Sequence, residues 1–395
     1  MDWTFKNIKN TMQHKLTILI ATGIMNAGGT ETLIMEILRH ETKRVRNVLL
    51  LHYHGQIQKG MFDDEIRELG IEILYIPSIR DLGISGYCRK FKEVVNNLGG
   101  VDIIHSHLNA SGGIICKAAK MAGIKHRICH CHADIRYKGS ELQKLKSELS
   151  LQVQRLLFVN RYANHFWACS HEAWKRLFYP WKKEVVIPNM IDVWKYLSTS
   201  EQKLQAKKEI GLENKFVVGS VGRVARIKNY ELAIYATAQL NNKGKETYFV
   251  CYGRFNAKSD AYYLELMQLV DKLNVKDKIL FMGNTTNVAH DIKAFDVFLM
   301  PSTTEGFGMA AIEAQAAGLP TLLSTGVPRI VDVELGLASF LPIEVDTWAN
   351  KIEKCRDVKL GEISHKAIIR AFDKRGYNSV TMVREIENKY LDICH

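Results

Sequence analysis

Proline and long apolar runs are both scarce in this sequence. Only 7 of its 395 residues are proline, and charged residues make up 24% and hydrophobic residues 47%, which excludes collagen-like and broadly disordered chains. No segment reaches the roughly 18 uninterrupted apolar residues of a membrane span, and Met1 to Lys15 lacks the apolar core of a signal peptide. The sequence therefore predicts a cytoplasmic globular protein with two or three domains, at about 150 residues each.

Cys-x-x-Cys pairs are also absent. The eight cysteines are scattered over expected strands and helices, which favours reduced, mostly buried thiols. From Cys129 to His132 the chain alternates Cys and His, the residue types that bind zinc. Successive side chains of a strand point to opposite faces, so the four cannot converge on one ion. We expect no metal here, a metal-independent role for His132 nearest the strand's carboxyl end, and buried, hydrogen-bonded rings for His130, His105 and His107.

Positive charge is unevenly distributed along the chain. Residues 1–190 hold 27 Lys and Arg against 17 Asp and Glu, whereas residues 191–395 hold 27 against 25. The excess in the first half indicates an anionic partner, which could be a membrane surface, a diphosphate-bearing substrate or nucleic acid. The alternative is a solvated basic surface that favours solubility.

Short β-branched apolar runs alternate with amphipathic segments, the pattern of βα units that build a parallel sheet. The rhythm occurs twice, so we predict an α/β protein with two doubly wound, Rossmann-like domains. The strands expected in the first domain are Leu16–Gly23, Asn47–His54, Ile71–Pro77, Val101–Leu108, His126–Ala133, Phe166–Ser170 and Glu184–Asn189. Those expected in the second are Phe216–Gly222, Tyr248–Gly253, Ile279–Gly283, Asp296–Ser302 and Thr321–Ser324.

The boundary between these domains is expected near residues 189–195, where Pro188 and a polar turn follow the last strand of the first domain. We therefore predict an N-terminal domain over 1–190 and a C-terminal domain over 191–377. The segment Asn378–Ile393 has apolar residues at helical spacing. We expect it to form a helix, within residues 378–395, that crosses back to the first domain.

Ligands of open α/β sheets bind beyond the carboxyl ends of the strands, so the loops after the strands are the candidate sites. The first such loop contains Gly28 and Gly29, which let backbone approach a ligand, and the helix that follows offers free N–H groups to a phosphate. It has no third glycine, so it does not match the G-x-G-x-x-G dinucleotide fingerprint. A simple tight turn remains the alternative.

A second loop, after the strand at 216–222, concentrates cations. Arg223 offers a forked guanidinium to phosphate oxygens and Lys228 a point charge, so together they could neutralise a diphosphate leaving group. Arg226 between them is either a third phosphate contact or a solvated side chain. Taken alone, the loop could be a solvated basic turn.

A third loop, Pro301–Gly308, joins a strand to a helix rich in small residues. Glu305 is expected in the loop and Glu313 about one turn into the helix. Backbone N–H groups of Gly306, Phe307, Gly308 and Met309 would point at the same place. Two glutamates at this separation occur by chance, but the context of strand, P-S-x-x-E-G-F-G and small-residue helix is specific.

Together these residues resemble the retaining glycosyltransferases of family 4, whose GT-B fold has two Rossmann-like domains facing each other across a cleft. The resemblance covers nearly the whole chain and is strongest for members that assemble capsular, exopolysaccharide or other lipid-linked bacterial glycans. Its anchors are residues 28–31, Asp102–His107, His132, Ala168–Ser170, Val186–Asn189, Gly222–Arg223 with Lys228–Asn229, and Glu305 with Glu313. A departure is Cys251–Phe255, where the family commonly has a second glycine-rich turn.

The resemblance implies a nucleoside-diphosphate sugar, most often UDP-linked, as donor and a lipid-linked glycan hydroxyl as acceptor. It implies that Arg223 and Lys228 hold the diphosphate, that Gly28, Gly29 and the 306–309 backbone approach it, and that Glu313 binds the ribose. Glu305 and His132 would face the donor sugar. The acceptor would attack from the face that the phosphate leaves, without a covalent intermediate. The sequence has no Asp-x-Asp metal signature, so Arg and Lys are expected to replace a divalent ion.

A membrane partner is indicated by Glu172–Lys183, where aromatic residues and cations interleave, and by the amphipathic stretch Glu141–Phe166. Peripheral contact with the inner face of the cell membrane is therefore expected, with packing of Trp174 and Phe178 in the core as the alternative. Two other classes stay open. A GT-B-fold epimerase or phosphorylase would share the two domains, and a nucleic-acid-binding protein would explain the pI near 9.2, although no such motif is present.

Overall fold

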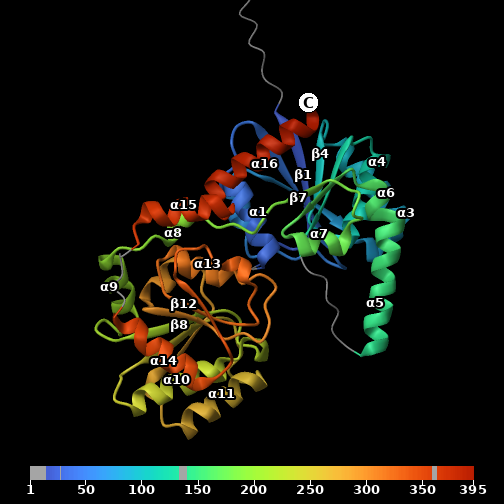
Figure 1. Ribbon diagram of the computed structural model, residues 1–395. Coiled ribbons are helices and arrows are strands. Elements are labelled where there is room, and N and C mark those ends of the chain that lie inside the picture. The colour runs from blue at the N-terminus through green and yellow to red at the C-terminus, as the bar shows by residue number, and fades with distance from the viewer. Residues whose placement is uncertain (1–14, 27, 133–139, 358–362) are drawn as a thin grey trace, which may run out of the picture. The chain divides into compact units, whose positions relative to one another are not determined.

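The computed structural model describes residues 15–26, 28–132, 140–357 and 363–395 (Figure 1). Contacts divide the chain into two compact units, the first made of Met1–Pro188 with Val383–His395 and the second of Asn189–Met382. The C-terminal helix α16 (Ser379–Cys394) begins in the second unit and continues in the first. The expected N-terminal segment up to residue 14 and the expected strand end at Ala133 lie outside the described residues.

The first unit is built on a seven-stranded parallel sheet in the order β3-β2-β1-β4-β5-β6-β7. All seven predicted strands are found, with ends that differ by a few residues. The strands are β1 (Leu16–Thr22), β2 (Val45–Tyr53), β3 (Glu72–Pro77), β4 (Ile103–Ser106), β5 (His126–Cys131), β6 (His165–Ala168) and β7 (Glu184–Val186).

Helices connect these strands, as right-handed parallel crossovers require. They are α1 (Gly29–Arg39), α2 (Asp63–Glu68), α3 (Ile79–Asn96), α4 (Gly112–Met121), α5 (Glu141–Gln154), α6 (Asn160–Tyr162) and α7 (His171–Leu177). Ser140 begins α5 with a capping box, in which its side chain accepts from the Gln143 N–H and the Gln143 side chain accepts from the Ser140 N–H. Figure 1 shows α5 extending away from the rest of the first unit.

The second unit has a six-stranded parallel sheet in the order β10-β9-β8-β11-β12-β13. Its strands are β8 (Val217–Val221), β9 (Tyr248–Tyr252), β10 (Ile279–Gly283), β11 (Val297–Met300), β12 (Thr321–Ser324) and β13 (Ala338–Leu341). The sequence did not predict β13. This strand has four residues, lies at the edge of the sheet and is only half-buried, so it lacks the apolar run of a central strand.

The second sheet is covered by helices on both faces. One apolar cluster joins it to α10 (Tyr230–Asn242), α11 (Ala261–Lys272) and α14 (Val345–Lys354). The other joins it to α8 (Val193–Tyr196), α13 (Met309–Ala316) and α15 (His365–Arg375). The remaining helices of this unit are α9 (Ser200–Glu209) and α12 (Val288–Asp291). Among the described residues, no helix is long and apolar enough to cross a membrane.

Both sheets share one topological feature that locates a site. In each sheet the second strand along the chain pairs with one side of the first strand, and the fourth strand pairs with the other side. β1 and β4 are therefore neighbours in the first unit, and β8 and β11 in the second. Ligands of such sheets bind at this switch point, outside the carboxyl ends of the two strands.

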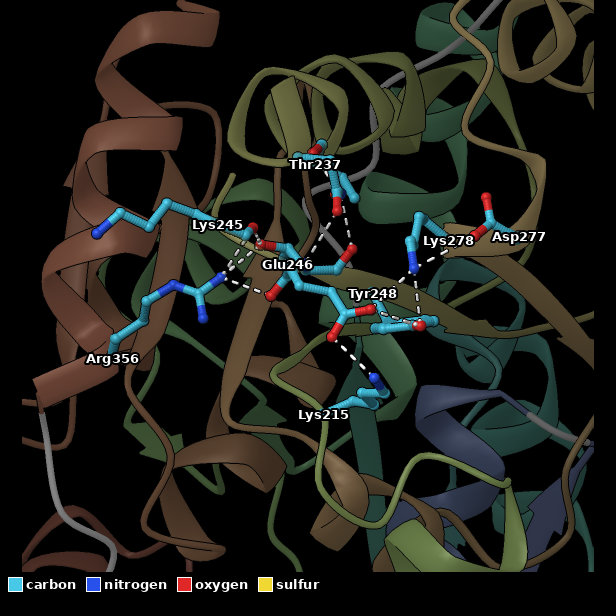
Figure 2. Close-up of polar contacts among 10 residues, drawn as sticks. Lys215, Thr237, Lys245, Glu246, Tyr248, Asp277, Lys278 and Arg356 are labelled. Atoms are coloured by element: carbon cyan, nitrogen blue, oxygen red, sulfur yellow. Dashed lines mark hydrogen bonds and ion pairs between the residues drawn. The ribbon is translucent and has the colours of Figure 1, made fainter. Parts of the chain in front are cut away.

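The amino ends of β8, β9 and β10 are tied together by a charged network (Figure 2). The Glu246 carboxylate pairs with Lys215 at 2.8 Å and with Lys278 at 3.0 Å, and Lys278 also donates to the Tyr248 hydroxyl at 2.8 Å. Arg356 donates to the backbone carbonyl of Glu246 at 2.8 Å. These contacts fix the end of the sheet opposite to the switch-point loops.

Candidate functional site

The loops after β8 and β11 meet at the switch point of the second unit. The Lys228 ammonium lies 2.6 Å from Glu305 Oε1, although the two residues are 77 positions apart in the sequence. Their side chains are only 20% and 13% exposed, which makes this a partly buried ion pair. The loops are joined further by Thr303, whose N–H donates to the Ile227 carbonyl at 2.8 Å. Two of the three catalytic residues predicted in the second unit, Lys228 and Glu305, are therefore in direct contact.

Two serines and a glycine hold Glu305 in place. The Ser302 hydroxyl donates to Glu305 Oε1 at 2.6 Å, and the Ser324 hydroxyl donates to the Ser302 carbonyl. The Glu305 N–H donates to the Gly326 carbonyl at 3.1 Å. A Cβ on Gly326 would lie 2.3 Å from the Thr303 carbonyl oxygen, so only glycine permits this approach. The carboxylate is thus positioned by its own loop and by the loop after β12.

Arg223 differs from Lys228 in being exposed. No hydrogen bond or ion pair of its side chain is found within the described part of the chain. Arg223 follows Gly222 in the loop after β8. A Cβ on Gly253, in the loop after β9, would lie only 1.9 Å from the Gly222 carbonyl oxygen, so the backbones of the two loops are in direct contact. Glycine at these two positions lets the loop carry Arg223 at the carboxyl end of β8.

Arg226, the third cation of this loop, forms an ion pair with Glu265. Its guanidinium lies 2.5 and 2.7 Å from the two carboxylate oxygens of Glu265 and over the Tyr262 ring, 5.4 Å from its centroid. Both partners of the ion pair are exposed. Arg226 is therefore at the surface with a carboxylate partner, and its role as a phosphate contact stays a prediction.

The loop after β11 ends at the start of α13. Gly308 has φ of 97°, a left-handed conformation that favours glycine, and it forms the N-cap of the helix. In the described residues no group accepts from the N–H of Gly306, Phe307 or Gly308. Met309 begins α13, so its N–H also lacks an intrahelical acceptor. Glu313 lies one turn into the helix and accepts a hydrogen bond from the Tyr196 hydroxyl at 3.1 Å.

In the first unit, the loop after β1 brings a carboxylate to the start of α1. Gly28 is the N-cap, Gly29 is the first helical residue, and a Cβ on Gly28 would lie 2.3 Å from Glu31 Oε2. Glycine at 28 therefore makes room for Glu31. Partial burial raises the pKa of the Glu31 carboxyl. Ala27, within this loop, lies outside the described residues.

His105 of β4, His130 of β5 and the residues that follow these strands, His107 and His132, lie side by side on the first sheet. The register pairs His105 with Ile128, which brings His105 and His107 beside His130 and His132. His107 Nδ1 lies 2.8 Å from His132 Nε2, and His105 Nε2 lies 3.0 Å from His130 Nδ1. Burial lowers the pKa of all four rings, that of His132 to about 3. His130, His105 and His107 are buried and hydrogen-bonded, as predicted.

These rings could suggest a metal site, because one nitrogen each from His105, His107 and His130 lies within 4.8 Å of the others. Both nitrogens of His105 already have partners, the Tyr390 hydroxyl and His130. One nitrogen each of His107 and His130 is buried without a partner among the described residues, whereas their other nitrogens bond to His132 and His105. Cys129 and Cys131 point away from these rings, into an apolar cluster of the opposite face.

Sequence reasoning did not identify several residues that hold the site. Ser302, Ser324 and Gly326 position Glu305, and Tyr196 contacts Glu313. In the first unit Asn109, at φ of 48°, accepts from the His132 N–H at 2.7 Å. Only the glycine in Ser324-Thr325-Gly326 offered a local signal, because a glycine just after a strand indicates close backbone approach.

Residues 202–357 match the family model described as "Glycosyl transferases group 1". This region lies within the second unit and contains Lys228, Glu305 and Glu313. The sequence is 28% identical over 374 residues to the Bacillus subtilis (strain 168) protein named "Putative glycosyltransferase EpsF", covering 93% of this chain and 94% of that protein. It is also 28% identical over 304 residues to an Escherichia coli UDP-Gal:alpha-D-GlcNAc-diphosphoundecaprenol alpha-1,3-galactosyltransferase, covering 74% and 76%.

Among solved structures, Anabaena Alr3699/HepE in complex with UDP matches with a TM-score of 0.76 at 21% identity, covering 96% of this chain and all of that one. At this identity the match concerns the fold. It confirms the prediction of two parallel-sheet, Rossmann-like domains of GT-B type.

Proposed function

We propose that this chain is a group 1 glycosyltransferase, which moves a sugar from a UDP-sugar to a hydroxyl of a lipid-linked glycan with retention of the anomeric configuration. The product would belong to a capsular polysaccharide, an exopolysaccharide or another cell-surface glycan. One observation carries the proposal: the contact of Lys228 with Glu305 at the switch point, within the region that matches the family. The lipid-linked acceptor is supported by the name of the Escherichia coli relative.

In this proposal the donor diphosphate binds beside the loop after β8. Arg223 has a free fork of N–H donors for phosphate oxygens, and Lys228 lies at the same strand end. Negative charge grows on the diphosphate as the bond to the sugar breaks, so cations fixed there lower the barrier. Glu305 supports this step because it holds the Lys228 ammonium at the carboxyl end of the sheet.

The sugar and the ribose would contact the loop after β11 and the start of α13. The unpartnered N–H groups of Gly306, Phe307 and Gly308 can donate to diphosphate oxygens, with Met309 beside them. Glu313 would accept from ribose hydroxyls and Glu305 would face the donor sugar. In the first unit, Gly28 and Gly29 would approach the donor, and His132 would contact the sugar.

Retention without a covalent intermediate follows if the acceptor hydroxyl attacks from the side on which the diphosphate leaves. A phosphate oxygen then takes the hydroxyl proton, the bond from the anomeric carbon to the phosphate oxygen breaks, and the new glycosidic bond forms on the same face. The charge stabilisation required is of the kind that Arg223 and Lys228 can supply. We therefore propose that the reaction needs no divalent ion.

A membrane surface is the proposed location of the acceptor, and α5 supports it. Leu142, Leu145, Leu149 and Leu156 follow one stripe of the segment and are 61–66% exposed, with Lys144 and Lys146 beside them. Trp181 is 74% exposed and stacks on Tyr179. Trp174 and Phe178 are buried, as the core-packing alternative predicts, so they do not contribute.

The membrane contact can be tested by liposome flotation. Leu145→Glu should reduce binding to vesicles that contain phosphatidylglycerol, because it places a negative charge in the apolar stripe. Leu264→Glu is the matched control, since Leu264 is an exposed leucine of the second unit. Equal vesicle binding by both variants and the wild type would contradict the proposed role of α5 in membrane contact.

The activity can be tested with UDP-, GDP- and ADP-sugars and a membrane extract that contains polyprenyl-diphosphate glycans. We expect transfer from a UDP-sugar, an α-linked product from an α-linked donor by NMR, and equal rates with and without EDTA. Transfer from none of the donors would contradict the proposed function, and inversion at the anomeric carbon would contradict the proposed mechanism alone.

A further inference from the structure

The four histidines in and just after β4 and β5 form two hydrogen-bonded pairs that lie against each other. His105 pairs with His130 and His107 with His132 across the two strands. The rings of His130 and His132 stack with centroids 4.1 Å apart, and those of His105 and His107 lie equally close, with their planes tilted by 38°. We call this arrangement the histidine stack.

The inner end of the histidine stack is fixed by aromatic residues. The Tyr390 hydroxyl of α16 lies 2.7 Å from His105 Nδ1. The Trp167 ring contacts His105 and His130 edge-on and stacks on Tyr390, with centroids 5.6 Å apart and an angle of 7°. All these rings are buried, so none can rotate without displacing its neighbours. His132 is at the other end, nearest the carboxyl edge of the sheet.

Hydrogen bonding within the stack couples the rings' protons. A neutral imidazole has one N–H donor and one acceptor nitrogen. In the bond between His107 Nδ1 and His132 Nε2, one of the two nitrogens must therefore carry the proton. The proton position on His107 then determines whether His132 Nδ1 is a donor or an acceptor. In the described residues His132 Nδ1 is shielded from solvent and has no partner, so a ligand that reached it would meet an unsatisfied nitrogen.

We propose that His107 is a positioning residue, which fixes the ring orientation and a single neutral tautomer of His132 and so prepares Nδ1 of His132 for the donor sugar. The inference rests on the proposed function, because His132 needs preparation only if it contacts a substrate. No carboxylate is among the partners of the four rings in the part of the chain described. Nothing in contact with the stack therefore favours the charged form of His132.

Nitrogen-15 NMR of histidine side chains tests the positioning without any substrate. The wild type should show His132 as one neutral tautomer from pH 5 to pH 8, assigned by its loss in His132→Gln. His107→Phe keeps a flat ring in the stack but removes the hydrogen bond, so His132 should become a mixture of tautomers. His107→Asn, whose amide can reach the position of Nδ1, should restore one form. A mixture in the wild type, or no change in His107→Phe, would overturn the proposal.

Tyr390→Phe is the matched control for a general loss of packing. It removes a buried hydrogen bond at the far end of the stack and does not touch His132. It should lower the melting temperature and leave the His132 signals unchanged. If it disturbs His132 as much as His107→Phe does, the effect is one of stability and His107 has no particular role.

Kinetics with UDP-glucose, UDP-galactose and UDP-N-acetylglucosamine connect the stack to the reaction. His107→Phe should lower turnover of the accepted donor by about tenfold to a hundredfold, with the Kd for UDP unchanged, because UDP carries no sugar. His107→Phe combined with His132→Ala should be no slower than His132→Ala alone. Additive losses would overturn the proposal. Failure of the wild type with every donor would contradict the proposed function and leave the NMR result to decide the positioning.

Discussion

The two ends of the sheet in the second unit use the same residue types for different purposes. At the amino end Glu246 lies between Lys215 and Lys278, and each charged group there has a partner on a neighbouring strand (Figure 2). At the carboxyl end Lys228 and Glu305 pair with each other, while Arg223 is exposed and unpaired among the described residues. Every charged side chain of the amino-end cluster has a partner of opposite charge, whereas the carboxyl end also carries the unpaired cation Arg223.

The difference teaches that an ion pair alone does not identify a site. Glu246 and Lys215 are 47% and 39% exposed, so their ion pair contributes little and is screened by salt, whereas Lys278 is 19% exposed. The Lys228–Glu305 pair lies on loops that glycines bring together, beside backbone N–H groups that have no acceptor among the described residues. Surplus donors at the carboxyl edge are what an anionic ligand requires.

The largest difference is expected between Lys228→Ala and Lys215→Ala. Lys228→Ala should lower kcat by roughly a hundredfold to a thousandfold, because a cation aimed at the leaving diphosphate is lost. Lys215→Ala should leave kcat within twofold of the wild type. Steady-state kinetics with the best donor measure both kcat values. An equal loss of kcat in the two variants would contradict the assignment of different roles to the two clusters.

Arg223→Ala should weaken UDP binding by about tenfold to a hundredfold, the effect of one charge-assisted hydrogen bond. Arg226→Ala, in the same loop but paired with Glu265, is the control and should bind UDP as the wild type does. Isothermal titration calorimetry gives both Kd values. A loss confined to Arg226→Ala would reverse the assignment of the two arginines.

Arg356→Ala should act on stability alone. Its guanidinium donates to two backbone carbonyls and to the Thr247 hydroxyl, and it lies over the Phe216 ring. We expect a loss of about 1–3 kcal/mol in the free energy of unfolding, measured by urea denaturation, with the Kd for UDP unchanged. A change in UDP affinity would indicate that the two ends of the sheet are coupled.

The smallest effect concerns pH. Lys215 and Lys278 lower the pKa of Glu246 to about 2 from its ordinary value of 4.5. A lowered pKa in the folded state adds stability above pH 4.5 that is lost as the pH falls towards 2. Glu246→Gln should therefore lower the melting temperature slightly at pH 7, and the difference from the wild type should shrink below pH 4.5 and vanish only as the pH falls through about 2. A constant difference across this range would show that charge is not responsible.

The sequence predicted the carboxyl end better than the amino end, and the reason is physical. Arg223, Lys228 and Glu305 follow strands directly, so their strand-end position could be inferred from the chain alone. Lys215, Glu246 and Lys278 are far apart in sequence and meet only because β8, β9 and β10 pair in that order. Ser324 and Gly326, which support Glu305, depend in the same way on the pairing of β11 with β12.

The histidine stack shows the same limit. Alternation along β5 predicted that His130 and His132 share a face. It could not show that His105 and His107 lie beside them, because that depends on the register of β4 against β5. The edge strand β13 was missed since its half-buried residues give no apolar run.

Amide NMR of the deuterated, nitrogen-15-labelled protein during titration with UDP tests the central claim most directly. We predict that the signals of Arg223, Gly306 and Gly308 shift with UDP, while those of Lys215, Glu246 and Lys278 stay in place. Shifts at the amino end, or no shifts at saturating UDP, would contradict the account of the carboxyl end as the UDP-sugar site.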